Sequence, residues 1–403
     1  MPQTQDPRRG LLLGLLQEAL GAVHGAHCVR VALAADPPSG PIRVAAVGKA
    51  AFAMAAGAHA ALGAAIDRTL VIARDVPPDG VPAWPGLEAL YGAHPVPDER
   101  SLRAGARLLS WVQELPPQVQ PLFLVSGGAS SLVEVLAPGV GLGALQELNR
   151  AALGQDIAIG EFNARRMRIS QIKGGRLAAA LQGRPGRALF LSDVPGDDAA
   201  VIGSGIMGPA PQGPDRVTRS VVGSVDTAVA CVARRGRELG LTVNAPPRRF
   251  EDSAVRLAAR FAHELSMGSA QLCVWGGEST LALPPQPGRG GRNQHLALSA
   301  ARLLAGHPDL MLLAVGTDGS DGVTEDAGAL VDAETCARLA LAELDADTCL
   351  QHANSAAALA ASGDLVHTGP TGTNVGDLVI GLKLSAAAAR ALPLHGGDRA
   401  RML

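Results

Sequence analysis

Short apolar runs of strand length end repeatedly at clusters of glycine with small polar or charged residues. Ligands of an open α/β sheet bind just beyond the carboxyl ends of its strands, where glycine lets backbone N–H groups approach an anion closely. Seven runs follow this pattern, the second more weakly than the others: 44–47, 70–73, 123–125, 188–191, 272–275, 311–315 and 365–367. The pattern predicts strands, and the charged residues at the turns indicate an enzyme with a phosphorylated ligand.

Alanine-rich stretches of helical length lie between the runs, so that strand, glycine turn and helix alternate. This alternation predicts an α/β fold with a parallel sheet covered on both faces. Near the N-terminus, Leu12, Leu16, Leu20 and Val23 fall on one face of an amphipathic helix. A proline-rich break at 245–249 suggests domains at 1–245 and 246–403. The other predicted helices are 51–65, 99–114, 142–160, 224–239, 252–266, 294–305 and 334–344.

Composition limits the partners of the chain. Hydrophobic residues make up 47% of it but aromatic residues only 2%, so its core is aliphatic. The formal net charge of −2 gives no long-range attraction to nucleic acid or acidic membranes, and no apolar run is long enough for a membrane span. Five scattered cysteines, with no C-x-x-C, fit reduced thiols in a cytoplasmic protein and argue against structural zinc.

One basic cluster allows three interpretations. A solvated helix face is the most common role of such residues, an anion site is less common, and nucleic acid binding is the least favoured because no aromatic residues are interspersed. The cluster consists of Arg165, Arg166, Arg168, Lys173 and Arg176.

Lys49 directly follows Gly48 at a predicted strand end and opens an alanine-rich helix. A cation beside a helix N-terminus suits a phosphate, although a solvated lysine at a turn is an equally open interpretation. The chain lacks the G-x-x-x-x-G-K-[ST] motif of P-loop proteins. It also lacks a G-x-G-x-x-G between a strand and a helix, which argues against nicotinamide binding.

The remaining charged turn residues are ambiguous one by one. The aspartates of two turns, including Asp193 and Asp318, either cap helices or accompany a hard cation carried by a nucleotide. Glu278, in a glycine turn, fits a site residue better than a packing residue. Arg292 follows a glycine pair and suits a transferring phosphoryl group, whereas Arg289 fits a solvent-exposed residue better. A structural histidine is the favoured interpretation of His94, which lies among prolines.

Eight short motifs occur in an order that is specific to one family. The chain resembles the glycerate 2-kinases whose C-terminal part is called the MOFRL domain, over about residues 10 to 390. The motifs are Val47-Gly48-Lys49-Ala50-Ala51, His94-Pro95-Val96-Pro97-Asp98-Glu99, Ile172-Lys173-Gly174-Gly175-Arg176-Leu177-Ala178, Ser192-Asp193-Val194-Pro195-Gly196-Asp197-Asp198, Gly276-Gly277-Glu278-Ser279-Thr280, Gly290-Gly291-Arg292-Asn293-Gln294, Gly316-Thr317-Asp318-Gly319 and Thr371-Gly372-Thr373-Asn374.

This resemblance implies ATP-dependent phosphorylation of D-glycerate, mainly to 2-phosphoglycerate, with Mg²⁺. It implies a larger N-terminal Rossmann-like three-layer domain and a smaller C-terminal α/β domain, with the active site in the cleft. Lys49 and Arg292 match the family's leading catalytic residues, and Asp193 and Glu278 match its acidic positions. Asp193 is therefore also expected to be catalytic and to lie nearest the Mg²⁺ that bridges ATP oxygens. The residues expected to bind substrate or nucleotide are Gly48, Ser126, Gly127, Gly128, Ser130, Lys173, Glu278, Asp318, Thr373 and Asn374.

Two rival functions stay open at this point. One is an NAD(P)H-dependent hydroxypyruvate reductase, a label also carried by members of the family. The other is a relative that binds its ligand without turnover, which departures from the family motifs make conceivable. The expected ligand is a small molecule, not nucleic acid or membrane, and a homodimer is left open. The departures are Ala129, Arg168, Ile206, Met207, His295 and Gly376, and those at Ala129, at Arg168 and at the pair Ile206 and Met207 are expected to touch substrate or phosphate turns.

Overall fold

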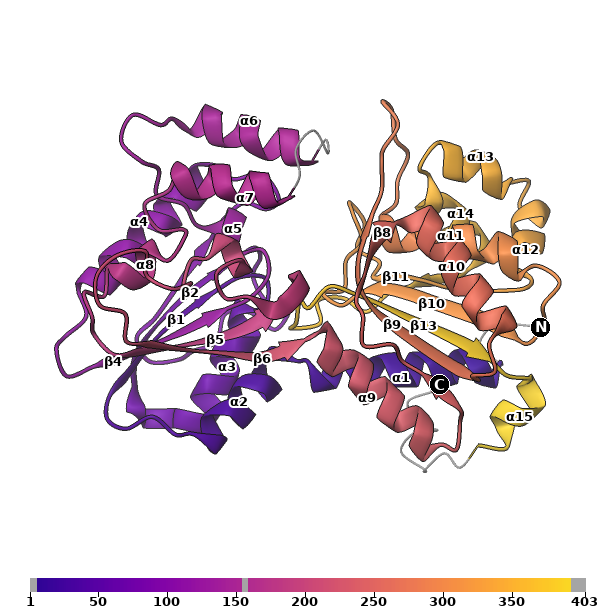
Figure 1. The fold of residues 1–403 in the computed structure, drawn as a ribbon, viewed down its shortest axis with the longest axis horizontal. Helices are drawn as coiled ribbons and strands as arrows, with labels where there is room; N and C mark the ends of the chain where they lie inside the picture. Colours follow the sequence, from indigo (N-terminus) through magenta and orange to yellow (C-terminus); the bar gives the residue numbers. More distant parts are fainter. Residues whose placement is uncertain (1–5, 154–158, 393–403) are drawn as a thin grey trace. The chain divides into compact units, whose positions relative to one another are not determined.

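The computed structural model describes residues 6–153 and 159–392. By their mutual contacts these residues form two compact units (Figure 1). The parallel-sheet unit contains residues 23–224 and Gly372–Val375, and the mixed-sheet unit contains residues 6–22, 225–371 and 376–392. This division differs from the expected boundary near residue 245. The reason is that helix α9 (Val225–Glu238) packs against strand β9 (Leu272–Thr280), and α1 (Pro7–Ala22) packs along α9.

In the parallel-sheet unit, every neighbouring pair of strands runs parallel, as the sequence predicts. Four predicted strands belong to this sheet, whereas β3 and β6 were not predicted, because neither is a continuous buried apolar run. The strand order is β3 (Leu87–Tyr91), β2 (Ile66–Ala73), β1 (Ile42–Val47), β4 (Gln120–Val125), β5 (Gly186–Ser192) and β6 (Val217–Ser224).

Helices cover both faces of this sheet and give it three layers (Figure 1). On β1, Ala45 and Val47 pack into a buried cluster with Leu108 and Trp111 of helix α4. All six residues of β1 are buried, as expected for a parallel strand covered on both sides. Helices α2 (Gly25–Ala35) and α3 (Ala51–Leu62) cover one face, and α4 (Glu99–Gln113), α5 (Ala129–Leu132) and α8 (Arg176–Ala179) cover the other, with α6 (Leu142–Leu153) and α7 (Ile159–Arg168) outside them.

The sheet of the mixed-sheet unit differs from the predicted parallel arrangement. Strand β13 (Asp377–Lys383) lies between β9 and β10 (Leu310–Gly316) and runs antiparallel to both. No helix separates β12 (Leu365–Val366) from β13 in the chain, so β13 returns without the crossover that parallel strands need. Its first residue therefore lies at the edge where β10 ends. The other strands are β7 (Val243–Asn244), β8 (Phe250–Ser253) and β11 (Gly328–Asp332).

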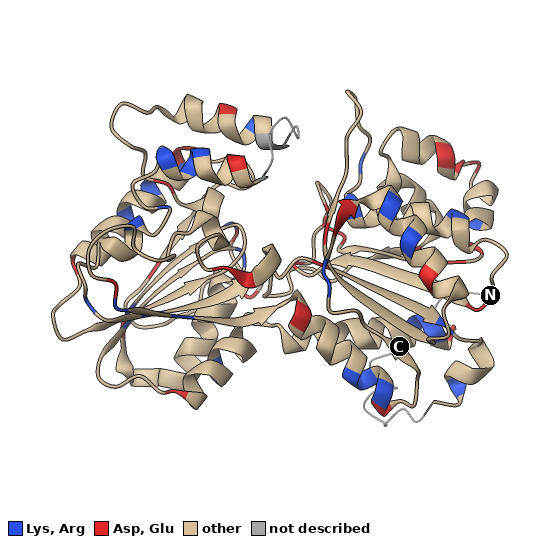
Figure 2. Ribbon diagram, in the orientation of Figure 1, with Lys and Arg blue, Asp and Glu red and all other residues tan. Residues whose placement is uncertain are grey.

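This second sheet is also covered on both faces (Figure 1). Helices α10 (Ala254–Met267) and α11 (Arg292–Leu304) bury one face, where Phe261 stacks on Trp275 with ring centroids 4.4 Å apart. Helices α1 and α9 cover the other face. Figure 2 shows acidic and basic residues distributed over both units. The remaining helices are α12 (Thr335–Leu341), α13 (Ala346–Gln351), α14 (Ser355–Ser362) and α15 (Ala386–Arg390).

Two further expectations concern the whole chain. The five cysteines are thiols, and three of them are buried. Over residues 6–153 and 159–392, no helix combines the length and the apolar character required to cross a bilayer.

Candidate active site

The strand order of the parallel sheet reverses between β1 and β4. From β1 the chain proceeds outward to β2 and β3, and from β4 it proceeds in the other direction to β5 and β6. Ligands of such sheets bind in the crevice outside the carboxyl ends of the strands at this switch point. Gly48 and Lys49 follow β1, and Ser126 and Gly127 follow β4, so two of the predicted turns meet at the position where a ligand is expected.

The two turns are bound to each other through their backbones. Lys49 N donates to Gly127 O at 2.9 Å, and Ser126 N donates to Val47 O at 3.0 Å. The buried hydroxyl of Ser126 accepts from Ala50 N at 3.0 Å. Gly48 has a φ of +133°, and a Cβ there would lie only 2.1 Å from Ser126 Oγ. The backbone that carries Lys49 is therefore held in one position.

The side chain of Lys49 extends across Gly128. A Cβ at Gly128, which has a φ of +83°, would lie 3.1 Å from Lys49 Cγ and 3.4 Å from His94 Cδ2. His94 follows β3, and both side chains are half-buried. The sequence favoured a structural role for His94, whereas the structure places its ring beside the predicted catalytic lysine.

Asp193 and Asn374 complete this cluster. Asp193 follows β5, and its Oδ2 accepts a hydrogen bond from Asn374 Nδ2 at 3.2 Å. A Cβ at Gly127 would lie 2.0 Å from each of these two atoms, so only glycine fits beneath the pair. The neighbouring Thr373 is 2% exposed. Four sequence-distant segments thus place a lysine, a histidine and a carboxylate around one glycine turn.

Lys173 also contacts this turn, from an enclosed position. Its side chain is fully buried, and Nζ donates to Ala129 O at 3.2 Å. Burial lowers the pKa of Lys173 to about 7, although Glu134 opposes this effect and Arg166 adds to it. The amine of Lys173 is enclosed here, so a contact of Lys173 with substrate stays a prediction. Sequence alone does not reveal this burial, since lysine is rarely buried.

The basic cluster that the sequence suggested is divided in the structure. Arg165 and Arg168 are exposed on α7, whereas Arg166 is 1% exposed. Arg176 donates through Nη1 to the backbone carbonyls of Met167 and Lys173 at 2.6 and 3.1 Å. A solvated helix face therefore accounts for only part of this cluster.

The mixed-sheet unit holds a second cluster around Arg292, the first residue of α11. Arg292 Nη1 donates to Glu278 Oε1 at 2.9 Å, and Nη2 lies 3.6 Å from Asp377 Oδ2. Its side chain is 40% exposed, so one part of the guanidinium faces solvent while two carboxylates hold the rest. Burial alone would lower the pKa of Arg292, but Asp377 and Glu278 more than offset this and raise it. Arg292 is therefore a fixed and permanent cation.

Asp377 and Asp321 anchor this cluster from inside the protein. Asp377 Oδ2 accepts from Ser279 N and Oγ, both at 3.1 Å, and Oδ1 accepts from Asn293 Nδ2 at 2.9 Å. Asp321 accepts from Asn293 N and Gln294 N at 3.1 and 2.7 Å. Burial raises the pKa of Asp321 to about 7, against the lowering effect of the hydrogen bond from Gln294 N. The sequence did not single out Asp377, because it is the first residue of a strand instead of following one.

Other predicted positions have more local surroundings. Asp318 Oδ1 accepts from Ser320 N and Oγ at 3.0 and 3.1 Å, which is typical of an aspartate that tightens a turn. Arg289 is exposed, in agreement with the favoured interpretation. Ser130 is half-buried on the same turn as Gly128.

The departures from the family motifs lie mostly away from open turns. Ile206 and Met207 are 1% and 0% exposed and pack in the same buried cluster as Ala129 of the glycine turn, so their expected contact with a ligand turn stays a prediction. Ala129 is buried, Arg168 is exposed, and His295 is 4% exposed on α11. Gly376 has a φ of +98°, which suits glycine, directly before β13.

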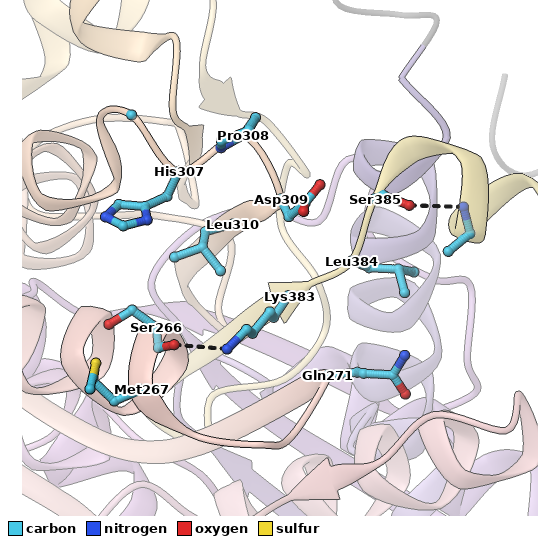
Figure 3. A pocket seen from close by; sticks show the side chains of 12 residues that line it. Ser266, Met267, Gln271, His307, Pro308, Asp309, Leu310, Lys383, Leu384 and Ser385 are labelled. Atoms are coloured by element: carbon cyan, nitrogen blue, oxygen red, sulfur yellow. Dashed lines mark hydrogen bonds between the residues drawn. The ribbon is translucent and has the colours of Figure 1, made fainter.

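A surface hollow of about 660 Å³ lies elsewhere on the mixed-sheet unit (Figure 3). It includes His307, Asp309 and Lys383 in its lining, but none of the predicted site residues. Lys383 Nζ donates to Ser266 O and Gly268 O at 2.7 and 3.1 Å, so its amine is bound to the end of α10. Among the side chains that the structure describes, no group of three or more His, Cys, Asp or Glu could hold a metal ion.

Comparison with known proteins gives matches over both units. The model of a domain of unknown function, DUF4147, matches residues 11–228, and that of the MOFRL family matches residues 271–377. A D-glycerate 2-kinase of Thermotoga maritima is 34% identical over 84% of this chain and 89% of its own. A protein of Agrobacterium vitis, provisionally named a hydroxypyruvate reductase, is 33% identical over 85% of this chain and 87% of its own.

A solved structure gives the same result. The crystal structure of glycerate kinase from Thermotoga maritima superimposes with a TM-score of 0.82 at 32% identity. The match covers 93% of this chain and 99% of that one, so it includes both sheets and the clusters at their edges. The chain belongs to the glycerate 2-kinase family, in which a DUF4147 domain precedes a MOFRL domain.

Proposed function

We propose that this protein transfers the terminal phosphoryl group of ATP to the 2-hydroxyl of D-glycerate, with Mg²⁺. The observation that carries the proposal is the position of Lys49, which crosses a glycine turn at the switch point of a parallel sheet beside Asp193 and Asn374. Backbone groups of such a turn and a lysine cation suit the phosphates of a nucleotide. The glycerate kinases among the relatives supply the substrate class.

The roles of the charged residues follow from the chemistry of phosphoryl transfer, which depends mainly on positioning and on stabilisation of negative charge. Lys49 would stabilise charge on the transferring group. Arg292, fixed by Glu278 and Asp377, would offer its exposed N–H groups to a phosphate or to the substrate carboxylate. This mechanism requires no strong base.

A Mg²⁺ ion that arrives with ATP fits the cluster of Lys49, Asp193 and Asn374 in the parallel-sheet unit. Mg²⁺ in kinases is usually held by one or two carboxylates together with substrate phosphates, so a cage of protein ligands is not needed. The half-buried carboxylate of Asp193 would supply such a ligand while Asn374 fixes its orientation. When bound, the ion would neutralise phosphate charge.

A coupled assay of ATP consumption tests the proposal against its rivals. The substrates are D-glycerate, tartronate, tartrate and hydroxypyruvate, each with Mg²⁺, and a parallel reaction follows NADH oxidation with hydroxypyruvate. We expect ATP consumption with D-glycerate and no NADH oxidation above background. NADH turnover that exceeds any kinase rate would support the reductase, and binding of D-glycerate without ATP consumption would support a non-catalytic relative.

A further inference from the structure

Three ionisable side chains are completely enclosed in the parallel-sheet unit. Glu134 and Lys173 are 0% exposed and Arg166 is 1% exposed. They come from three segments: Glu134 follows α5, Arg166 lies on α7, and Lys173 precedes α8. One carboxylate therefore faces two basic groups. We refer to Glu134, Arg166 and Lys173 as the buried triad.

Both basic groups of the triad bind backbone carbonyls of the glycine turn. Lys173 Nζ donates to Ala129 O at 3.2 Å, and Arg166 Nη2 donates to Ser130 O at 2.5 Å. Arg166 Nη1 also donates to Asn149 Oδ1 at 3.3 Å. Consecutive carbonyls of the segment that begins at Ser126 are thus held from inside the protein.

Glu134 links the two basic groups to Ser170, in the segment that leads to Lys173. Its Oε1 accepts from Ser170 Oγ at 2.5 Å and from Val135 N at 3.1 Å. Its Oε2 lies 3.5 Å from Arg166 Nε, and neither of these two buried atoms has a hydrogen bond. Ser170 Oγ accepts in turn from Lys173 N at 3.0 Å, which fixes the start of the lysine side chain.

Such an arrangement is a poor way to stabilise a fold. Removing charged groups from water costs several kcal/mol for each ion, and well-packed apolar residues of similar volume are often as stable or more stable. The triad leaves one basic group without a matching carboxylate and two polar atoms without hydrogen bonds. A role other than stability is therefore worth testing.

Lysine is also rare in this chain. The sequence contains three lysines, Lys49, Lys173 and Lys383, among 35 basic residues, so the remaining 35 − 3 = 32 are arginines. Two of the three lysines contact the same turn, Lys49 at Gly128 and Lys173 at Ala129. A compact ammonium group fits an enclosed position where a planar guanidinium would need more space.

We propose that Lys173 and Arg166 are positioning residues of the reaction, which hold the turn from Ser126 to Ser130 in the conformation on which Lys49, His94 and Asp193 rest. This inference rests on the proposed function, because the turn matters only if it carries the ligand. Other side chains lie close against Gly127 and Gly128, since added Cβ atoms would meet Asp193, Asn374 and Lys49. A small shift of the turn would therefore displace all of these groups.

The first test compares Lys173→Met with a matched control, Lys383→Met. Both substitutions remove a lysine that donates to backbone carbonyls, and Lys383 lies in the other unit, outside the proposed site. For Lys173→Met we expect kcat to fall roughly 100-fold, the effect of misplacing reacting groups by about 1 Å, with KM values changed by less than about threefold. The melting temperature should be equal to or above that of the wild type. Lys383→Met should keep kcat within about twofold.

A second pair of variants covers the case in which Lys173→Met does not fold. Arg166→Lys keeps the charge but loses one of two hydrogen bonds, so its kcat should lie between that of the wild type and that of Arg166→Met. A kcat within about twofold of wild type in folded Lys173→Met would overturn the inference. The inference would also be overturned if activity in the Arg166 variants falls only in proportion to the loss of folded protein.

A readout independent of turnover separates this inference from the proposed function. With three lysines, the rate at which an amine-specific acylating reagent modifies Lys49 is measurable by mass spectrometry without overlap. We expect Lys173→Met to change the Lys49 rate at least threefold and Lys383→Met to leave it unchanged. If the wild type consumes no ATP with D-glycerate but this difference is found, the proposed function fails and the positioning role holds. An unchanged Lys49 rate in folded Lys173→Met contradicts the positioning role.

Discussion

At the scale of single residues, Lys49 is the residue on which the proposed activity depends most. Its stem crosses Gly128, its backbone N donates to Gly127 O, and its side chain is half-buried. We expect Lys49→Ala to lower kcat/KM, with a rise of about 2–4 kcal/mol in the activation free energy, the effect of losing one preorganised charge. The melting temperature should stay within about 2 °C of the wild type. Steady-state kinetics and thermal denaturation measure both, and wild-type kinetics would identify Lys49 as a solvated turn residue.

Arg292 offers a sharper distinction between two roles. Its guanidinium reaches Glu278 and Asp377 at once, and a lysine could not reproduce this geometry. If Arg292 acts only in the transition state, Arg292→Lys should lower kcat roughly 100-fold and leave the KM for ATP nearly unchanged. If it binds the substrate carboxylate in the ground state, the KM for D-glycerate should rise while kcat holds. An unchanged kcat excludes the transition-state role.

The buried lysine makes a separate prediction about stability and pH. Native Lys173 has a pKa of about 7, whereas the ordinary value is 10.5, so between these values the unfolded chain binds more protons. The contribution of Lys173 to the free energy of unfolding therefore rises with pH across this window. The difference in free energy of unfolding between the wild type and Lys173→Met, measured by urea denaturation at pH 7 and pH 9, isolates this contribution. The contributions of the other titrating groups cancel in the difference. A difference that stays constant or falls as the pH rises would show that the pKa of Lys173 is not lowered.

The sequence predicts the open part of the candidate site and misses the enclosed part. Lys49 follows β1 after one glycine, and Asp193 directly follows β5 in a turn that contains Gly196, a local pattern that places both at a sheet edge. Asp377 begins its strand, and its proximity to Arg292 depends on an antiparallel pairing that no local pattern encodes. The burial of Lys173 depends on residues distant in sequence, Ala129, Glu134 and Arg166, whose proximity periodicity does not describe.

At the scale of elements, the glycine turn after β4 is the feature that brings the parallel-sheet cluster together. An alanine at position 127 would place its Cβ 2.0 Å from both Asn374 Nδ2 and Asp193 Oδ2. We expect Gly127→Ala to lower stability by about 1–3 kcal/mol through overpacking and to lower kcat more strongly than it affects melting. Gly14→Ala is the control, since a Cβ there meets nothing within 4 Å on helix α1. It should raise stability by about 0.5–1 kcal/mol without changing activity. Equal activity in both variants would contradict the role of the turn.

All seven predicted strands are present, because a buried apolar run that stops at glycine is a strong local signal. Strand β6 was missed because Thr218, Arg219 and Ser220 interrupt its apolar character. Strand β13 was missed because its turn residues precede it, and with it the antiparallel character of the second sheet. The direction of a strand depends on the connection that leads to it. The residue types of a loop do not reveal this direction, because a short loop and a long one can contain the same residues.

At the scale of the whole molecule, each unit contributes one charged cluster at a sheet edge. Lys49 and Asp193 belong to the parallel-sheet unit, and Arg292 and Glu278 belong to the mixed-sheet unit. The segment Gly372–Val375 belongs to the first unit although the chain on either side of it belongs to the second. The sequence does not predict this interleaving, nor the association of the N-terminal helix α1 with the mixed sheet, because both depend on contacts between distant segments.

The most direct test of the account is phosphorus NMR of a reaction that contains the protein, ATP, Mg²⁺ and D-glycerate. Phosphate on the 2-hydroxyl is attached to a carbon with one hydrogen, so the proton-coupled resonance of the product is a doublet. Phosphate on the 3-hydroxyl is attached to a CH₂ group and gives a triplet. We predict a doublet that grows as the γ-phosphate signal of ATP declines, and that is strongly reduced with Lys49→Ala. ATP signals that remain unchanged with the folded wild-type protein would contradict the account.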